Sequence, residues 1–227
     1  MEEREFETNA IRMQMDRSGN LEHSAPLYLT SSFVFEDAED MRASFAEEKD
    51  RNIYSRYANP NTSELISKVC QMEGAEAGFA FASGMAAVYS TFAALLESGD
   101  HIVSCSSVFG STMSLYQNFF PKWQISTDLF NVNDSATSIE ALIKPNTKVI
   151  YVESPTNPGV DILDLQMIGD IAKKHSLILI VDNCFASPYL QQPISFGAHL
   201  VVHSATKLID GQGRVLGGIT VGEATLI

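Results

Sequence analysis

Polar and small residues gather directly after five apolar segments of this sequence. In chain order they are Ser83-Gly84-Met85, Ser104–Phe109, Glu153–Asn157, Asp182-Asn183 and Ser204–Lys207. Apolar segments that alternate with helical patterns predict a mostly parallel sheet, and such sheets bind ligands beyond the carboxyl ends of their strands. The sequence therefore predicts that these five runs meet at one edge of a sheet and form a binding site there.

The run Ser83-Gly84-Met85 has the form of a turn from a strand into a helix. Glycine permits a tight turn, and the free N–H groups and dipole at the start of a helix favour an anion such as a phosphate. The same residues also fit a plain helix start capped by the Ser83 side chain, and for this run alone that interpretation is favoured. A phosphate site here depends on the neighbouring runs.

Asp182 ends the most hydrophobic segment of the chain, Leu177–Val181. A carboxylate beside such a segment is costly unless it meets a cation. A protonated pyridine nitrogen is such a cation, and pairing it with a carboxylate makes the ring a better electron sink. An aspartate that caps the following turn is the alternative, and this residue alone does not decide between the two.

Lys207 closes the run His203-Ser204-Ala205-Thr206-Lys207. An amine held near buried surface is nucleophilic toward an aldehyde, and the hydroxyls of Ser204 and Thr206 are suited to hold a phosphate. A lysine taken alone is ordinarily a solvated surface charge. The lysine becomes a candidate for catalysis only in combination with Asp182 and the glycine turn.

Together these residues resemble the fold-type-I pyridoxal-phosphate (PLP) enzymes of cysteine and methionine metabolism. Five motifs match in order: Tyr54-Ser55-Arg56, Ser83-Gly84-Met85, Glu153-Ser154-Pro155-Thr156-Asn157-Pro158, Asp182-Asn183-Cys184-Phe185-Ala186-Ser187-Pro188 and His203-Ser204-Ala205-Thr206-Lys207. The resemblance extends from about Thr8 to the last residue. It implies an α/β, PLP-dependent transferase-like fold, with helices on both faces of a mostly parallel sheet and with a C-terminal domain that this chain does not contain.

The resemblance also implies roles for individual residues. Lys207 would hold pyridoxal 5'-phosphate as a Schiff base and shuttle protons, and Asp182 would pair with the pyridine nitrogen. The other cofactor-binding residues would be Asn157 at the phenolic oxygen, Phe109 stacked on the ring, Ser83, Gly84, Met85, Ser204 and Thr206 around the phosphate, and Tyr54 and Arg56 at the phosphate of a neighbouring subunit. The implied partners are an amino-acid substrate and a homo-oligomer, a dimer with shared sites that assembles into a tetramer.

Phe109 narrows the expected reaction. Many family members carry tyrosine at this place, and phenylalanine cannot donate a proton to a leaving group. With Asp210–Gly218 after the lysine, the chain most resembles the O-succinylhomoserine sulfhydrylases. They are transferases of methionine biosynthesis and trans-sulfuration, and they replace the γ-substituent of O-succinylhomoserine, or of O-acetylhomoserine, with sulfide to give homocysteine. The alternatives are methionine γ-lyase, a cystathionine γ-synthase or γ-lyase, and a PLP-binding fragment without activity.

The elements that must position these residues begin at about Thr62. Strands are expected at Gly78–Ala82, His101–Ser104, Lys148–Glu153, Leu177–Val181, His199–His203 and Gly218–Gly222, and helices at Met85–Leu96, Ser111–Phe119 and Leu165–His175. Residues 1–60 are polar and predict an N-terminal arm that contacts a neighbouring subunit, with one short helix near Asp37–Ala46. Residues 61–227 then form the PLP-binding large domain. The apolar C-terminus at Leu226-Ile227 leads us to expect that this domain is incomplete.

Composition restricts the remaining classes of function. The 227 residues are 45% hydrophobic and 19% charged, with a net charge of −13, which disfavours nucleic acid and anionic membranes as partners. No apolar run reaches the roughly 20 residues that span a bilayer, and three scattered cysteines favour a reduced, cytoplasmic protein. No metal is expected, because His199 and His203 on one strand would lie about 13 Å apart.

Overall fold

The computed structural model describes residues 5–13 and 17–227. The chain divides into two compact units, Met1–Lys68 and Val69–Ile227. Residues 1–4 and 14–16 of the predicted arm lie outside the described residues. In the part of the chain that is described, no helix combines the length and the apolar character needed to cross a bilayer.

The first unit contains two short helices, α1 (Phe6–Arg12) and α2 (Ala38–Phe45), and most of a third, α3 (Pro60–Glu73). Asp37 caps α2 by accepting a hydrogen bond from the backbone N–H of Asp40. The Asp40 carboxylate is buried and binds Lys49 and Arg51. The hydrogen bond from Lys49 is the main cause that lowers the pKa of Asp40 to about 2. This ion-pair cluster, rather than an apolar core, organises the segment around α2.

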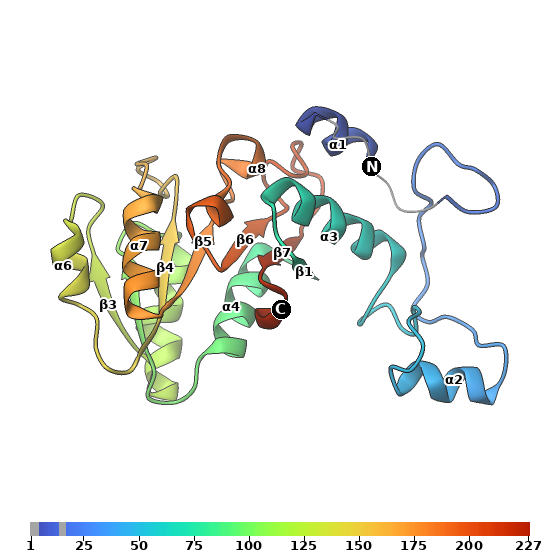
Figure 1. The fold of residues 1–227 in the computed structure, drawn as a ribbon, viewed down its shortest axis with the longest axis horizontal. Coiled ribbons are helices and arrows are strands. Elements are labelled where there is room, and N and C mark those ends of the chain that lie inside the picture. The colour runs from blue at the N-terminus through green and yellow to red at the C-terminus, as the bar shows by residue number, and fades with distance from the viewer. Residues whose placement is uncertain (1–4, 14–16) are drawn as a thin grey trace. The chain divides into compact units, whose positions relative to one another are not determined.

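The second unit is built on a seven-stranded sheet in the order β1-β7-β6-β5-β4-β2-β3 (Figure 1). Its strands are β1 (Ala77–Phe81), β2 (His101–Cys105), β3 (Ser126–Phe130), β4 (Thr147–Glu153), β5 (Ile178–Asp182), β6 (Leu200–Ser204) and β7 (Gly218–Gly222). Strands β3, β2, β4, β5 and β6 pair in parallel, and β7 is antiparallel to both of its neighbours. The expected mostly parallel sheet is confirmed.

Helices follow most of these strands. They are α4 (Gly84–Leu95), α5 (Gly110–Ser114), α6 (Ala136–Glu140), α7 (Leu165–His175) and α8 (Ser187–Leu190), with the single turns η1 (Leu115–Phe119), η2 (Phe120–Trp123), η3 (Pro193–Phe196) and η4 (Ala224–Leu226). Helix α4 packs on β6 and β7, and α7 packs on β5. The core between α4 and the sheet is rich in aromatic rings, since Phe92 contacts Tyr116, Phe120 and Tyr151.

Several elements were not predicted from the sequence, among them strand β3 and helix α3. Strand β3 has a polar sequence, Ser126-Thr127-Asp128-Leu129-Phe130, and is a strand because it pairs with β2 at the edge of the sheet. Pairing of this kind is not visible in local propensity. Helix α3 did carry a signal: Asn59 precedes Pro60, and proline is favoured in the first turn of a helix.

Candidate active site

A cavity lies where β1, β4, β5 and β6 end. Its lining is Gly84, Met85, Val88, Phe109, Glu153, Asn157, Asp182, Cys184, Phe185, Val202, Ser204 and Lys207. Seven of the predicted site residues are in this set: Gly84, Met85, Phe109, Asn157, Asp182, Ser204 and Lys207. The structure therefore brings the carboxyl ends of separate strands together as expected for a parallel sheet.

The start of α4 meets the end of β6 at Gly84. A Cβ atom added to Gly84 would lie 2.5 Å from the Cβ of Ser204, so only glycine permits this approach. The Ser83 hydroxyl accepts a hydrogen bond from the backbone N–H of Ala86 at 3.1 Å and caps the helix. Ser83 is not among the cavity residues, so its side chain does what the plain helix-start interpretation requires, while Gly84 and Met85 line the cavity.

Asp182 is almost fully buried at the end of β5. The Tyr151 hydroxyl donates to its Oδ2 atom at 3.1 Å, and the backbone N–H of Cys184 donates to its Oδ1 atom at 3.2 Å. Burial raises the pKa of Asp182, while the hydrogen bonds from Cys184 and Tyr151 oppose that rise. Within residues 5–13 and 17–227, no cationic side chain forms an ion pair with this carboxylate, which leaves it suited to a cation from outside the chain.

Glu153 was not given a role from the sequence, although it begins one of the matched motifs. It is paired with Asp182 in the β4–β5 register and is 2% exposed. Its Oε2 atom accepts a hydrogen bond from the backbone N–H of Phe109 at 2.6 Å, which fixes the turn that carries the Phe109 ring. Burial, and then the charge of Asp182, raise the pKa of Glu153 to about 8. The signal that points to it is a carboxylate at the end of an apolar strand, the same signal that identified Asp182.

The end of β6 and the loop after it hold Ser204 and Lys207 at the cavity, with the lysine exposed to solvent. The backbone N–H of Ser204 donates to the Cys184 sulfur at 2.7 Å, so Cys184 joins this segment to the end of β5. Thr206 does not line the cavity: its hydroxyl accepts from the backbone N–H of Gly217 at 3.1 Å. The structure thus gives Thr206 a bond within the loop, and its predicted contact with a phosphate stays a prediction.

Tyr54 and Arg56 belong to the first unit and are exposed there. The Arg56 guanidinium lies over the rings of Tyr54 and Tyr57, at 5.1 and 5.3 Å from their centroids. In the part of the chain that the structure describes, Arg56 forms no salt bridge with a carboxylate. Its predicted contact with the phosphate of a neighbouring subunit stays a prediction.

His203 takes part in a buried polar cluster behind the site. Its Nε2 atom lies 2.6 Å from Glu73 Oε1, which also accepts from the Asn183 amide at 2.8 Å. All three residues are buried. His203 follows Val202, which lines the cavity, and side chains alternate along a strand. The cluster therefore lies on the other face of the sheet, where it joins the end of α3 to β6.

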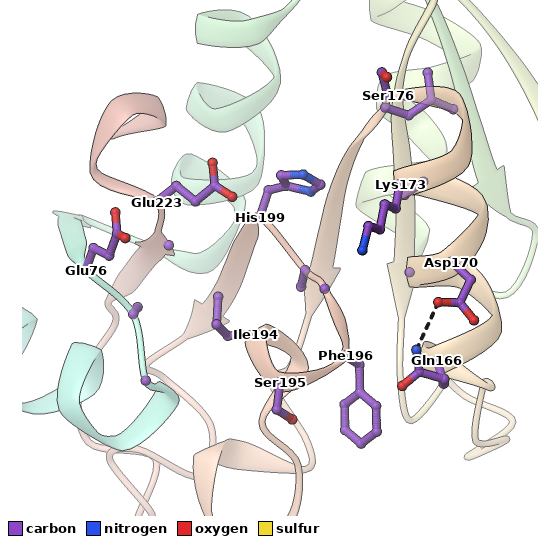
Figure 2. Close-up of a pocket in the computed structure, with 18 residues that line it drawn as sticks. Glu76, Gln166, Asp170, Lys173, Ser176, Ile194, Ser195, Phe196, His199 and Glu223 are labelled. Atoms are coloured by element: carbon purple, nitrogen blue, oxygen red, sulfur yellow. Dashed lines mark hydrogen bonds between the residues drawn. The ribbon is translucent and has the colours of Figure 1, made fainter.

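A larger cavity, of about 570 Å³, lies elsewhere in the second unit (Figure 2). It includes Glu76, Asp170, Lys173, His199 and Glu223 in its lining. His199 directly precedes β6, and α7 leads into β5, so this cavity lies at the amino ends of parallel strands. None of the predicted site residues lines it. Because ligands of such sheets bind at the carboxyl ends, we place the active site at the smaller cavity.

The smaller cavity fits pyridoxal phosphate by its chemistry. Asp182 offers a buried negative charge, Lys207 offers an amine, and the amino end of the 12-residue helix α4 offers backbone N–H groups to an anion. Phe109, 43% exposed, offers a ring face. These four features match, in the same order, four parts of the cofactor: the ring nitrogen, the aldehyde, the phosphate and the ring.

Comparisons with known proteins agree with this chemistry. The family model for Cys/Met metabolism PLP-dependent enzymes matches residues 7–226. An O-succinylhomoserine sulfhydrylase of Pseudomonas aeruginosa is 45% identical over 217 residues, which are 96% of this chain and 54% of that protein. An L-methionine gamma-lyase of Porphyromonas gingivalis is 37% identical over 205 residues, 90% of this chain and 51% of that protein. The chain thus spans about half the length of these relatives.

A solved structure supports the same assignment. A Campylobacter jejuni protein with N'-pyridoxyl-lysine-5'-monophosphate at position 205 of its chain superimposes with a TM-score of 0.93 at 34% identity. The match covers 99% of this chain and 55% of the other. The expected fold, that of the PLP-dependent fold-type-I enzymes, is therefore confirmed.

Proposed function

We propose that this protein is a sulfhydrylase of methionine biosynthesis. The proposal starts from the family to which the chain belongs, the Cys/Met metabolism PLP-dependent enzymes. The enzyme would replace the acyl group of O-succinylhomoserine with sulfide and release homocysteine. The observation that carries this choice is Phe109, which lines the cavity without a hydroxyl group. The similarity to O-succinylhomoserine sulfhydrylases supports it.

The residues of the cavity divide the work. When bound, pyridoxal phosphate supplies an electron sink that acidifies the substrate protons at Cα and then at Cβ. The Lys207 amine would hold the cofactor covalently and move these protons. Asp182 would keep a proton on the ring nitrogen, and Asn157 would bond the phenolic oxygen. The amino end of α4 and Ser204 would bind the phosphate, with Thr206 as a further predicted contact.

Phe109 leads to the expected substrate preference. A carboxylate departs from Cγ readily as its anion, whereas a thiolate departing from methionine needs more help from an acid. Loss of a general acid costs on the order of 10²–10⁴ in rate, so the ester should be preferred over methionine. The test is a side-by-side measurement of kcat/KM for O-succinylhomoserine, O-acetylhomoserine and methionine, with sulfide present. A higher value for methionine would replace this proposal with a γ-lyase, and a higher value for the acetyl ester would change only the acyl group.

Two alternative functions can be tested by separate measurements. Relatives named methionine and cystathionine gamma-lyases support an elimination reaction, which the same substrate comparison detects. A PLP-binding protein without activity would show cofactor absorbance and no turnover on any of these substrates.

All three cysteines are free, which favours a reducing compartment, and we propose the cytoplasm.

We further propose that the protein is a homo-oligomer, a tetramer built from dimers. In each subunit, residues 61–227 would form the PLP-binding domain. Residues 1–60 would form an arm that completes the site of a neighbouring subunit. Tyr54 and Arg56 would bind the partner's cofactor phosphate, a group that arginine contacts in a bidentate way. The exposed guanidinium supports this, as do the exposed apolar side chains Leu27, Leu29 and Val34 in the same segment.

Mixing two inactive variants tests the shared site. An Arg56→Ala protein mixed with a Lys207→Ala protein should form hybrid dimers in which one site carries both defects and the other carries neither. Activity should therefore partly return, as measured by homocysteine formation after subunit exchange. If hybrids are demonstrated by native mass spectrometry and remain as inactive as the parents, Arg56 does not act across a subunit boundary.

A further inference from the structure

The Asp182 carboxylate is held by donors from two different elements. The Cys184 backbone N–H at its Oδ1 atom would be present with any residue at position 184 except proline. The Cys184 thiol also hydrogen-bonds this carboxylate. The Tyr151 hydroxyl at its Oδ2 atom is the side-chain donor from the neighbouring strand β4. Tyr151 lies two residues before Glu153, the register partner of Asp182, so the three side chains point to the same face of the sheet.

The ring of Tyr151 lies in an aromatic cluster, and its hydroxyl faces Asp182. The residue is fully buried, and its ring lies 5.1 Å from the ring centroid of Phe92 and 6.4 Å from that of Tyr116. Burial raises the pKa of Tyr151 well above its ordinary value, so the phenol stays protonated and acts as a donor. A buried donor without an acceptor is costly. The phenol proton is therefore directed to Asp182.

We propose that Tyr151 is a positioning residue for the cofactor: its hydroxyl fixes the orientation of the Asp182 carboxylate toward the cavity where the ring nitrogen would bind and, beside the bonds from Cys184, favours the ionised form. This inference rests on the proposed function to the extent that Asp182 meets the cofactor ring. It doesn't depend on which substrate the protein uses.

The sign of the effect follows from the two states of Asp182. Burial favours the protonated form, and the Tyr151 hydrogen bond favours the ionised form. Deleting the hydroxyl therefore raises the pKa of Asp182 further, and the carboxylate is lost at a higher pH on acidification. The other titratable groups near Asp182 are Glu153 on β4, Cys184 after β5, His203 on β6, Lys207 after β6 and Tyr116 on η1. A Tyr151 variant leaves all of them in place.

The chain offers a matched control in Tyr116. This second buried tyrosine belongs to the same aromatic cluster, but its hydroxyl lies 3.1 Å from Ser104 Oγ rather than against Asp182. Tyr151→Phe and Tyr116→Phe each delete one buried hydroxyl from the same core. Only the first removes a donor to Asp182.

The measurement is the dissociation constant of pyridoxal phosphate, followed by cofactor absorbance from pH 5 to pH 8 in the natural protein that carries this chain. Tyr151→Phe should weaken binding about two- to tenfold near neutral pH, and the loss of binding on acidification should move to higher pH. Tyr116→Phe should leave that pH dependence unchanged. In an Asp182→Asn background, Tyr151→Phe should lose most of its effect, as expected for residues that act through one contact.

Equal pH profiles for the two tyrosine variants would overturn the inference, and so would an undiminished Tyr151→Phe effect in the Asp182→Asn background. The free energy of unfolding of each variant, measured in urea, shows whether a loss of cofactor binding is caused by a less stable fold. Turnover of O-succinylhomoserine is measured on the same samples. Tight cofactor binding with the expected Tyr151 shift but without turnover would contradict the sulfhydrylase proposal and support the role of Tyr151.

Discussion

Replacement of Lys207 by alanine should lower turnover by on the order of 10²–10⁴ or more, because it removes both the covalent attachment of the cofactor and the base that moves protons at Cα and Cβ. Lys207 is exposed at the cavity, so its loss should leave the free energy of unfolding nearly unchanged. After borohydride reduction of the wild-type protein, peptide mass mapping should place a pyridoxyl group on Lys207.

The matched control is Lys173→Ala. Lys173 lies on α7 and lines the larger cavity of Figure 2, so the pair of variants also compares the two cavities. We expect turnover and the reduced adduct to be unaffected by Lys173→Ala. An adduct on Lys173 or Lys174, or equal loss of activity in the two variants, would show that Lys207 has been assigned the wrong role.

Asp182→Asn should lower activity without lowering the stability of the cofactor-free protein. The amide cannot pair with the cation at the ring nitrogen, and loss of a charged hydrogen bond costs about 1.5–3 kcal/mol, or on the order of ten- to a hundredfold in turnover. In the cofactor-free protein, the raised pKa of Asp182 means that ionisation destabilises the fold. That penalty is absent below the ordinary pKa of an aspartate, grows as the pH rises from that value to the raised folded value, and is complete above the folded value.

The cofactor-free Asp182→Asn protein should therefore melt at the same temperature as the wild type or higher at neutral pH, while its turnover falls. Thermal melts of cofactor-free protein at pH 4 and pH 7.5, beside kcat of protein saturated with cofactor, test both halves. Asp170→Asn, on α7 at the larger cavity, serves as the control that should change neither. Wild-type turnover in fully loaded Asp182→Asn would exclude the electrostatic role.

The sequence by itself determined the class of fold and most of the cavity lining. Residues such as Gly84, Asp182 and Lys207 interrupt or end apolar segments, and the buried strands β4, β5 and β6 are apolar enough to be recognised locally. Once those segments are strands of a parallel sheet, their carboxyl ends share an edge. The sequence is then enough to predict that the residues following these strands lie close together.

The tertiary structure alone decided what those residues touch. Thr206 carries the same hydroxyl chemistry as Ser204, but the loop turns it to Gly217. Tyr151 reads in the sequence as one more apolar position of a buried strand, and only the β4–β5 register places its hydroxyl on Asp182. Glu153 gained its bond to Phe109 from a chain segment 44 residues away. Such contacts depend on strand register and loop direction, which arise from pairing between distant segments, and local composition does not encode that pairing.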